Sequence, residues 1–290
     1  MAKDEKIKIG FAGTPEIAFA HFNHLLNSSD IDISFVLTQP NKKSGRGLEE
    51  SKTLFNDIDK NIPILQPENL NDQDTISTIS KMKIDLLVVV AYGKILPDWV
   101  LEYPKFGCLN IHFSLLPKWR GAAPIQHALL NQEDSTGVST FLIEPKVDTG
   151  KIIDQLKIVI TKDDNYGSLS KKLSEAGADL IESSINKCLH HSSELTEQDS
   201  SMATLAPKIS KGDLKINWND KSDTILAKVR AFSPTPGAFT TINSKRLKIF
   251  KAESINNDNN HEIGSIYHVD KNFFDVQCCL LYTSPSPRDS

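Results

Sequence analysis

Long hydrophobic stretches are missing from this chain of 290 residues. The longest apolar run, Leu86 to Tyr92, has seven residues, whereas a helix that spans a membrane needs about 20. Residues Met1 to Gly10 alternate Lys with Ile and lack the apolar core of a secretory signal. The sequence therefore predicts a cytoplasmic protein that has no membrane partner.

Cysteines and nucleotide-binding motifs are also scarce. The four cysteines, at positions 108, 188, 278 and 279, match neither a disulfide framework nor a zinc spacing. Of the glycines in a dinucleotide-binding fingerprint, only Gly10 and Gly13 are present, and no acidic residue follows Leu37. There is also no Walker motif. These absences leave metal and ATP chemistry without a recognisable site, and a nicotinamide oxidoreductase becomes a weak alternative.

The first 190 residues alternate short apolar runs with helical patterns. The run from Leu86 is so continuously apolar that it predicts a central strand covered on both faces. This alternation predicts an α/β fold with a doubly wound, mostly parallel sheet in a domain over residues 1–190. Expected strands are Ile7–Phe11, Ile33–Leu37, Leu86–Ala91, Leu109–His112, Ser139–Ile143 and Ile152–Ile160, and expected helices are Pro15–Asn27, Pro124–Asn131 and Tyr166–His190.

The remainder of the chain predicts a linker and a second domain. Residues 191–206 are rich in Ser, Glu, Thr and Gln, which is typical of a linker. Residues 207–278 contain short strand-like runs and predict a small all-β barrel of the OB type. The expected strands there are Leu214–Trp218, Ala238–Ile242, Arg246–Ala252 and Phe273–Gln277.

Charge divides the chain at the same place. Residues 1–206 carry 21 basic and 28 acidic side chains, and residues 207–278 carry 11 and 8. A basic second domain attached to an acidic body indicates a polyanionic partner, although a solvated lysine-rich face is the commoner origin of any single charge run.

The last twelve residues, 279–290, have no helix or strand period and resemble a translated sequencing adaptor. We interpret them as a non-native tail, which would leave the barrel incomplete; the alternative is a natural tail rich in Ser and Pro.

Two polar segments could carry chemistry. Asn110 and His112 are two residues apart, which places both side chains on one face of a strand. An amide donor beside an imidazole can bind a developing oxyanion while the imidazole handles a proton. Asp148-Thr149-Gly150 supplies a carboxylate between two strands, but alone it is typical of a turn.

Taken together, these and other motifs resemble the folate-dependent formyltransferases over about Lys6 to Gln277, and specifically the members that act on tRNA. The motifs, in family order, are Gly13-Thr14-Pro15, Gly45-Arg46-Gly47, Gln66-Pro67, Ala91-Tyr92-Gly93-Lys94-Ile95-Leu96-Pro97, Asn110-Ile-His112, Ser114-Leu-Leu-Pro117, Trp119-Arg-Gly-Ala-Ala-Pro124, Asp148-Thr-Gly150 and Ala206-Pro207-Lys208.

The resemblance implies that 10-formyltetrahydrofolate donates a formyl group to the α-amino group of methionyl initiator tRNA, without a metal ion or ATP. Asn110 and His112 would bind the oxyanion, and Asp148 would orient His112 or accept the proton of the amine. The folate would lie against Ser114, Leu115, Leu116, Pro117, Ile95 and Leu96, and the tRNA against Lys42, Lys43, Arg46 and the barrel residues Lys215, Arg246 and Lys248.

Two other interpretations remain open. A formyltransferase that acts on a small amine, such as a ribonucleotide or an amino sugar, would share the same three catalytic candidates. A non-catalytic RNA-binding protein would use the barrel alone. No DNA partner is expected.

Overall fold

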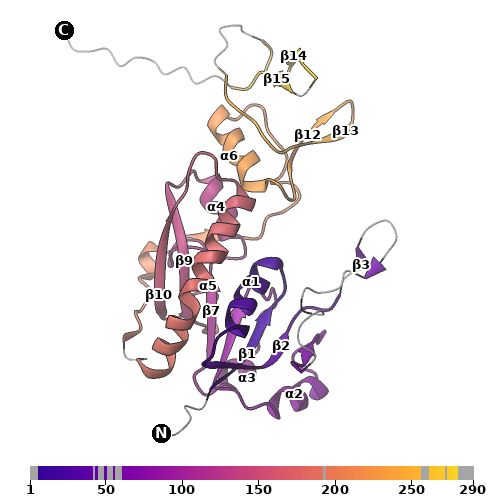
Figure 1. Ribbon diagram of the computed structural model, residues 1–290. Helices are drawn as coiled ribbons and strands as arrows, with labels where there is room; N and C mark the ends of the chain where they lie inside the picture. The colour runs from indigo at the N-terminus through magenta and orange to yellow at the C-terminus, as the bar shows by residue number, and fades with distance from the viewer. Residues whose placement is uncertain are drawn as a thin grey trace, which may run out of the picture. The chain divides into compact units, whose positions relative to one another are not determined.

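The computed structural model describes residues 6–41, 43–44, 49–50, 55, 61–191, 194–255, 261–271 and 273–279 (Figure 1). The chain forms two compact units. Unit 1 contains residues 1–124, 134–160 and 169–208, and unit 2 contains residues 125–133, 161–168 and 209–290. Of the predicted non-native tail, residues 279–290, only Cys279 is described, and it forms an isolated parallel bridge with Lys221; the rest lies outside the described residues.

Unit 1 is built on a seven-stranded sheet in the order β10-β9-β7-β6-β1-β2-β5. Neighbouring strands from β5 to β7 are parallel, while β9 is antiparallel to both β7 and β10. The mostly parallel sheet predicted from the sequence is therefore confirmed. The strands are β1 (Ile7–Gly13), β2 (Ile31–Leu37), β5 (Ile64–Leu65), β6 (Leu86–Val90), β7 (Cys108–His112), β9 (Ser135–Leu142) and β10 (Ile152–Val159).

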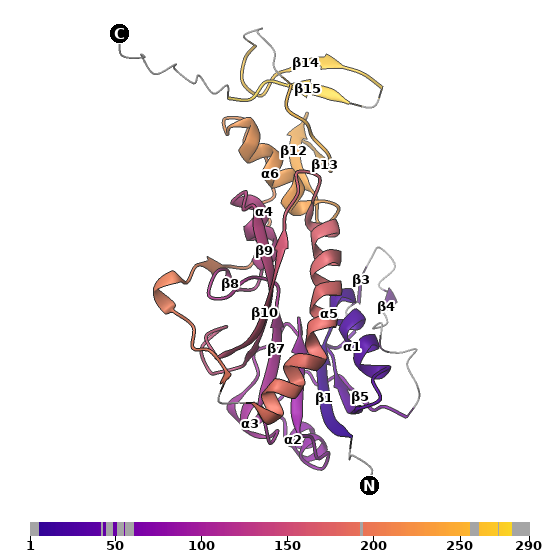
Figure 2. The same cartoon turned by 60° about the vertical axis from the view of Figure 1, so that its left-hand side comes forward.

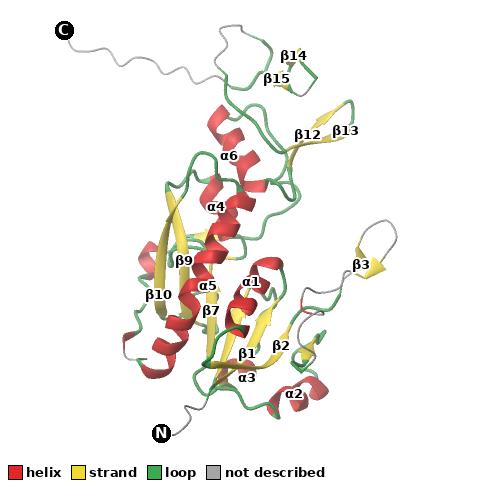
Figure 3. Ribbon diagram, viewed as in Figure 1, coloured by secondary structure: helices red, strands yellow, loops and turns green. Residues whose placement is uncertain are grey.

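Helices cover both faces of this sheet. On one face, α1 (Glu16–Leu26) packs Phe22 edge-on against Phe11 of β1, with a centroid distance of 5.4 Å. The long helix α5 (Tyr166–His190) lies beside α1, where the Ser174 hydroxyl donates to the Ile17 carbonyl at 3.4 Å (Figure 3). The opposite face packs against α2 (Gln73–Ser80) and α3 (Asp98–Glu102) through a core cluster that includes Ile79 and Val100.

The described part of unit 2 contains two short antiparallel strand pairs. They are β12 (Ala238–Ile242) with β13 (Lys245–Ile249), and β14 (Ile266–Val269) with β15 (Phe274–Val276). Helices α4 (Pro124–Leu130) and α6 (Ser222–Phe232) belong to the same unit. The strand pattern of the sequence did not predict α6, and Leu214–Trp218 forms only an isolated bridge at Lys215 instead of a full strand.

The segment expected to be a linker makes contacts of its own. Within unit 1, β11 (Leu205–Ala206) pairs in parallel with β8 (Arg120–Gly121), and Thr196 forms an antiparallel bridge with Ile152. A short 3-10 helix, η3 (Ser200–Met202), lies between these two contacts. Figure 2 shows this segment running back from α5 past β8. We call residues 194–206 the strap.

Two further short strands, β3 (Lys43–Ser44) and β4 (Glu49–Glu50), pair with each other. No helix among the described residues is long and apolar enough to cross a membrane.

Candidate functional site

Loops with the quoted motifs meet at the carboxyl edge of the parallel strands. Thr14 follows β1 and donates its hydroxyl to the carbonyl of Tyr92, which follows β6, at 3.2 Å. The Gln39 amide after β2 donates to the same carbonyl at 2.8 Å, and the Gln66 amide donates to the Gln39 carbonyl at 3.0 Å. This edge is the usual ligand position in open α/β sheets, and β7 ends there with His112.

Each ring nitrogen of His112 has a polar neighbour, and one of the two nitrogens is hydrogen-bonded. It is 6% exposed, and its Nε2 lies 2.8 Å from the carbonyl oxygen of Trp119. Because a carbonyl can only accept a hydrogen bond, Nε2 carries a proton in this arrangement. The other nitrogen, Nδ1, faces Oδ2 of Asp148 at 3.7 Å. The sequence-predicted pair of His112 and Asp148 is thus brought together.

Burial sets the charge state of this imidazole. It lowers the pKa of His112 below its ordinary value, and the Asp148 carboxylate and the Trp119 carbonyl oppose part of that shift. The imidazole is therefore neutral near pH 7, with a free lone pair on Nδ1, and it can accept a proton. Any added charge is stabilised by Asp148 on one side and by Trp119 on the other.

Asn110 lies on the same face of β7 as His112 and is half-buried. The residue between them, Ile111, points to the opposite face, toward α5 near Gly177. Within the described residues no hydrogen bond engages the Asn110 amide. Its N–H donors are therefore available for a ligand.

Asp148 occupies a turn that few residues can adopt. Its φ is +52°, in the left-handed region where Asp and Asn are tolerated better than most residues. Oδ2 accepts the backbone N–H of Gly121 at 2.7 Å. Two residues later, a Cβ at Gly150 would lie 1.8 Å from the Leu142 carbonyl oxygen, so only glycine fits. The D-x-G motif thus fixes the carboxylate beside His112.

The loop from Ser114 to Pro117 is fixed by a buried hydroxyl. Ser139 Oγ accepts the Leu116 N–H at 2.9 Å and donates to the Ser114 carbonyl at 2.6 Å. The Gln155 amide donates to the Leu116 carbonyl at 2.9 Å. Ser114 and Leu116 are buried, whereas Leu115 and Pro117 are half-buried and could contact a ligand.

The other folate candidates differ from each other in exposure. Ile95 is 87% exposed, whereas Leu96 is 8% exposed and belongs to the core cluster around α2 and α3. Only Ile95 presents a free apolar surface.

The structure describes only some of the candidate tRNA-binding residues. Lys42 and Arg46 lie outside the described residues, and only the backbone of Lys43, in β3, is described. In unit 2, Lys215, Arg246 and Lys248 are exposed. The guanidinium of Arg246 lies 3.7 Å from the ring centroid of Phe239 on the neighbouring strand.

The sequence analysis missed Gln198 and Thr204 as site residues. Both lie in the strap, and both contact the loops that hold His112 and Asp148. The residues around them in the sequence are polar, and this composition indicates only a linker. Arg120 and Trp119 could have been found, because they belong to the quoted Trp119-Arg-Gly motif.

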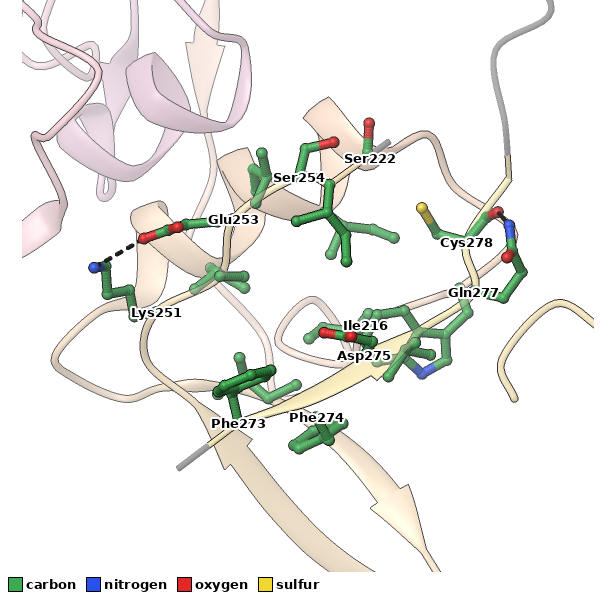
Figure 4. A pocket seen from close by; sticks show the side chains of 18 of the residues that line it. Ile216, Ser222, Lys251, Glu253, Ser254, Phe273, Phe274, Asp275, Gln277 and Cys278 are labelled. Carbon is green, nitrogen blue, oxygen red and sulfur yellow. Dashed lines mark hydrogen bonds and ion pairs between the residues drawn. The ribbon is translucent and has the colours of Figure 1, made fainter. Parts of the chain in front are cut away.

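A separate hollow lies in unit 2. It has a volume of about 870 Å³, and its walls come from α6, β13 and β15, with Phe273 and Phe274 on one side (Figure 4). Lys251 and Glu253 form an exposed ion pair at 2.9 Å among its lining residues. Its walls are mainly apolar, and its His268–Asp275 pair at 2.9 Å joins opposite positions of β14 and β15. Nothing in it reproduces the buried His112 arrangement.

No group of three or more His, Cys, Asp or Glu side chains in the described part of the chain could hold a metal ion.

Comparisons with known proteins identify the family of the chain. A family described as Formyl transferase matches residues 6–185, and Formyl transferase, C-terminal domain, matches residues 208–280. The chain therefore belongs to the formyl transferase family, and it is a formyl-transferring enzyme.

Two relatives are similar over almost the whole chain. A methionyl-tRNA formyltransferase of Nitrosomonas eutropha is 39% identical, with 94% of this chain and 86% of the relative covered. The enzyme of the same name from Kosmotoga olearia is 38% identical, with coverages of 94% and 88%.

Among solved structures, the N-formyltransferase of Helicobacter canadensis in complex with folinic acid and dTDP-3-aminofucose has a similar fold. Its TM-score is 0.67 at 23% identity, covering 94% of this chain and 96% of that one.

Proposed function

We propose that this chain transfers the formyl group of 10-formyltetrahydrofolate to the α-amino group of methionyl initiator tRNA, for the initiation of translation. The observation that carries the proposal is the buried His112, which lies between the Trp119 carbonyl and the Asp148 carboxylate and on the same strand face as Asn110, whose amide has no hydrogen bond among the described residues. Relatives that are 38–39% identical and bear the name methionyl-tRNA formyltransferase support the choice of acceptor.

The proposed role of each side chain follows from which of its donor and acceptor atoms lack a hydrogen-bond partner among the described residues. The amine attacks the formyl carbon, a new C–N bond forms, and negative charge develops on the formyl oxygen. The Asn110 amide donates to this oxygen, since its N–H groups have no other partner among the described residues. Removing one such donor typically costs about 10² to 10³ in rate.

His112 then acts as the proton acceptor. The sequence analysis expected it to donate to the oxyanion, but its Nε2–H is engaged by Trp119. Nδ1 takes the proton that the attacking amine loses, and Asp148 stabilises the imidazolium. The proton leaves on the departing nitrogen of the folate when the donor C–N bond breaks.

The donor fits the rigid loop at Ser114 to Pro117, whose backbone is fixed by Ser139 and Gln155. The half-buried Leu115 and Pro117 and the exposed Ile95 would provide apolar contacts to a flat pterin. The donor supplies the formyl carbon, and the chain's own groups orient it and handle the proton.

We further propose a division of labour along the chain. Residues 1–190 catalyse, and residues 207–278 form the basic tRNA-binding domain, with Lys215, Arg246 and Lys248 supplying affinity through phosphates. Arg46, with Lys42 and Lys43 beside it, reads the acceptor end of the tRNA. The proposal places the enzyme in the cytoplasm, a compartment that suits its buried free thiols Cys108 and Cys188.

The test is a formylation assay with 10-formyltetrahydrofolate and separate acceptors: charged initiator tRNA, charged elongator tRNA and an amino-sugar nucleotide. We expect formylated methionyl initiator tRNA as the main product, and we expect Arg46→Ala to reduce it far more than it reduces salt-sensitive tRNA binding. Preferential formylation of the amino sugar, or tRNA binding without any formylation, would overturn the proposal.

A further inference from the structure

The strap touches both loops that hold His112. Thr204 accepts the backbone N–H of Trp119 on its Oγ1 at 2.9 Å, and its carbonyl accepts the Arg120 N–H at 2.9 Å. Trp119 has a φ of +61°, and its carbonyl is the partner of His112 Nε2. One side of the imidazole therefore depends on a strained residue that the strap restrains.

The other side depends on Gln198. Its Nε2 donates to the carbonyl oxygens of Asp148 at 3.0 Å and of Gly150 at 2.7 Å. Its Oε1 accepts from Arg120 Nε at 3.0 Å and Nη2 at 2.8 Å. All four hydrogen-bonding positions of the amide are used, and the neighbours fix its orientation, since carbonyls need donors and a guanidinium needs an acceptor.

These contacts connect three parts of the chain that are distant in sequence. Gln198 lies 50 residues after Asp148 and 78 after Arg120. Arg120 is 8% exposed, so its contact with Gln198 is shielded from water. The residue after Arg120, Gly121, donates its N–H to Asp148 Oδ2. Gln198 thus closes a ring in which the Asp148 carbonyl and carboxylate are both fixed.

We infer that Gln198 is a positioning residue for formyl transfer, which holds the Asp148 carboxylate against His112 by donating to the carbonyls of Asp148 and Gly150. The inference rests on the proposed function for its kinetic consequence, but the geometry itself can be tested without activity. It assigns a catalytic purpose to a segment whose composition is that of a linker.

The two N–H donors of the Gln198 amide are the groups that hold Asp148. Asp148 has a φ of +52°, and rotating its peptide toward an ordinary conformation would move the carboxylate away from His112. The two N–H bonds from Gln198 oppose that rotation. The amide oxygen of Gln198 binds only Arg120. A substitution can therefore remove the two donated hydrogen bonds while it keeps the contact with Arg120.

The decisive variant is Gln198→Glu. A carboxylate keeps the contact with Arg120, as an ion pair, but it cannot donate to the two carbonyls and instead repels them. Gln198→Leu removes both halves. The matched control is Glu197→Gln, the same exchange of amide and carboxylate at the adjacent position, where the 74% exposed side chain of Glu197 contacts Lys151.

Kinetically, we expect Gln198→Glu to lower kcat by about 10- to 100-fold with little change in the KM for tRNA, whereas Glu197→Gln keeps the parent values. Structurally, we expect faster hydrogen exchange at the Gly121 amide, measured by NMR in the full chain, because its acceptor is Asp148 Oδ2.

A Gln198→Glu protein with the parent kcat and the parent Gly121 exchange rate would overturn the inference. Equal losses in kcat and in tRNA affinity would also overturn it, since they would indicate a general structural role. If the parent protein forms no formylated tRNA, the proposed function fails, while the Gly121 exchange rate still decides the role of Gln198.

Discussion

The two units of the chain differ in how their strands are joined. Unit 1 has one continuous sheet of seven strands with helices on both faces. The described strands of unit 2 form separate pairs, with a hollow of about 870 Å³ lined by α6, β13 and β15. The catalytic candidates His112 and Asp148 lie in unit 1, whereas unit 2 presents exposed basic side chains.

The proposed division of labour accounts for this difference. Proton transfer needs groups held within hydrogen-bond reach. A continuous sheet, whose strands are joined by many hydrogen bonds, can hold them there. Contacts with phosphates need positive charge at a surface, and they tolerate variation in geometry because attraction to phosphates persists over several ångströms. The following predictions test the contrast.

The largest effect is expected from the pair in unit 1. His112→Ala and Asp148→Asn should each lower formyl transfer by about 10² to 10⁴ while tRNA affinity stays near the parent value, because general acid–base groups act in the transition state. Single-turnover rates and a separate binding titration measure the two quantities. Glu144→Gln, an exposed carboxylate near the same turn, is the control. Near-parent turnover in either variant removes that residue from the mechanism.

The next prediction compares the substitution of one glycine in each unit. In unit 1, Gly150→Ala would place a Cβ 1.8 Å from the Leu142 carbonyl oxygen, and we expect a loss of about 2–4 kcal/mol in the free energy of unfolding. In unit 2, a Cβ at Gly212 would meet only Ser210 Oγ at 3.6 Å. Gly212→Ala should change that free energy by less than about 0.5 kcal/mol. Urea unfolding measures both, and equal effects would contradict the argument.

Sequence patterns predicted unit 1 better than unit 2, for physical reasons. Helix α5, Tyr166–His190, was predicted with its observed bounds, because a long amphipathic pattern is a strong signal. In unit 2, Ile225, Val229 and Phe232 have helical spacing within α6, but a short segment between strand-like runs was easily missed. Short helices such as α2, with only Ile79 buried, give weaker signals still.

The site itself was only partly predictable. The spacing of Asn110 and His112 places them on one strand face, but nothing local joins His112 to Asp148, 36 positions later. That connection came from the resemblance, and the structure places the two groups 3.7 Å apart. Gln198 could not be predicted, because a side chain that binds the backbone of distant turns leaves no pattern in its own neighbourhood.

Acid should weaken unit 1 through a buried histidine. His21 on α1 is fully buried against Phe113 and Gly177, with Nδ1 bonded to the Ile17 carbonyl at 2.7 Å and no hydrogen bond to Nε2 in the described residues. Burial lowers the pKa of His21 to about 4; the Ile17 carbonyl opposes the shift, and His24 adds to it.

The unfolded histidine titrates near pH 6.5, so between pH 6.5 and about 4 the unfolded chain binds a proton that the folded chain does not. The free energy of unfolding of unit 1 should therefore fall over this window, by up to about 3 kcal/mol. His21→Leu should remove this part of the pH dependence, and the exposed His190→Gln should not. A His21→Leu protein with the parent slope in urea titrations from pH 7 to 4 would contradict the assignment.

The smallest effect is expected in unit 2, at the exposed cations. Arg246→Ala and Lys248→Ala should each weaken tRNA binding modestly and reduce the slope of log K against log salt concentration by about one unit. We expect Arg246 to be the more sensitive of the two, because its guanidinium stacks on Phe239 at 3.7 Å and is held in place, whereas the Lys248 ammonium has no ion pair or hydrogen bond among the described residues. Arg246→Lys should therefore keep the salt slope but lose part of the affinity.

Neither change in unit 2 should alter the turnover at saturating tRNA, since the proposed proton acceptor, His112, lies in unit 1. Lys171→Ala, an exposed lysine on α5 whose side chain is 80% accessible, should leave both the salt slope and turnover unchanged. If Arg246→Ala lowers single-turnover formylation at saturating tRNA as strongly as Asp148→Asn does, unit 2 takes part in the chemistry and the separation of tasks is wrong. If the salt slope does not change, the basic face of unit 2 is not the surface that the tRNA phosphates contact.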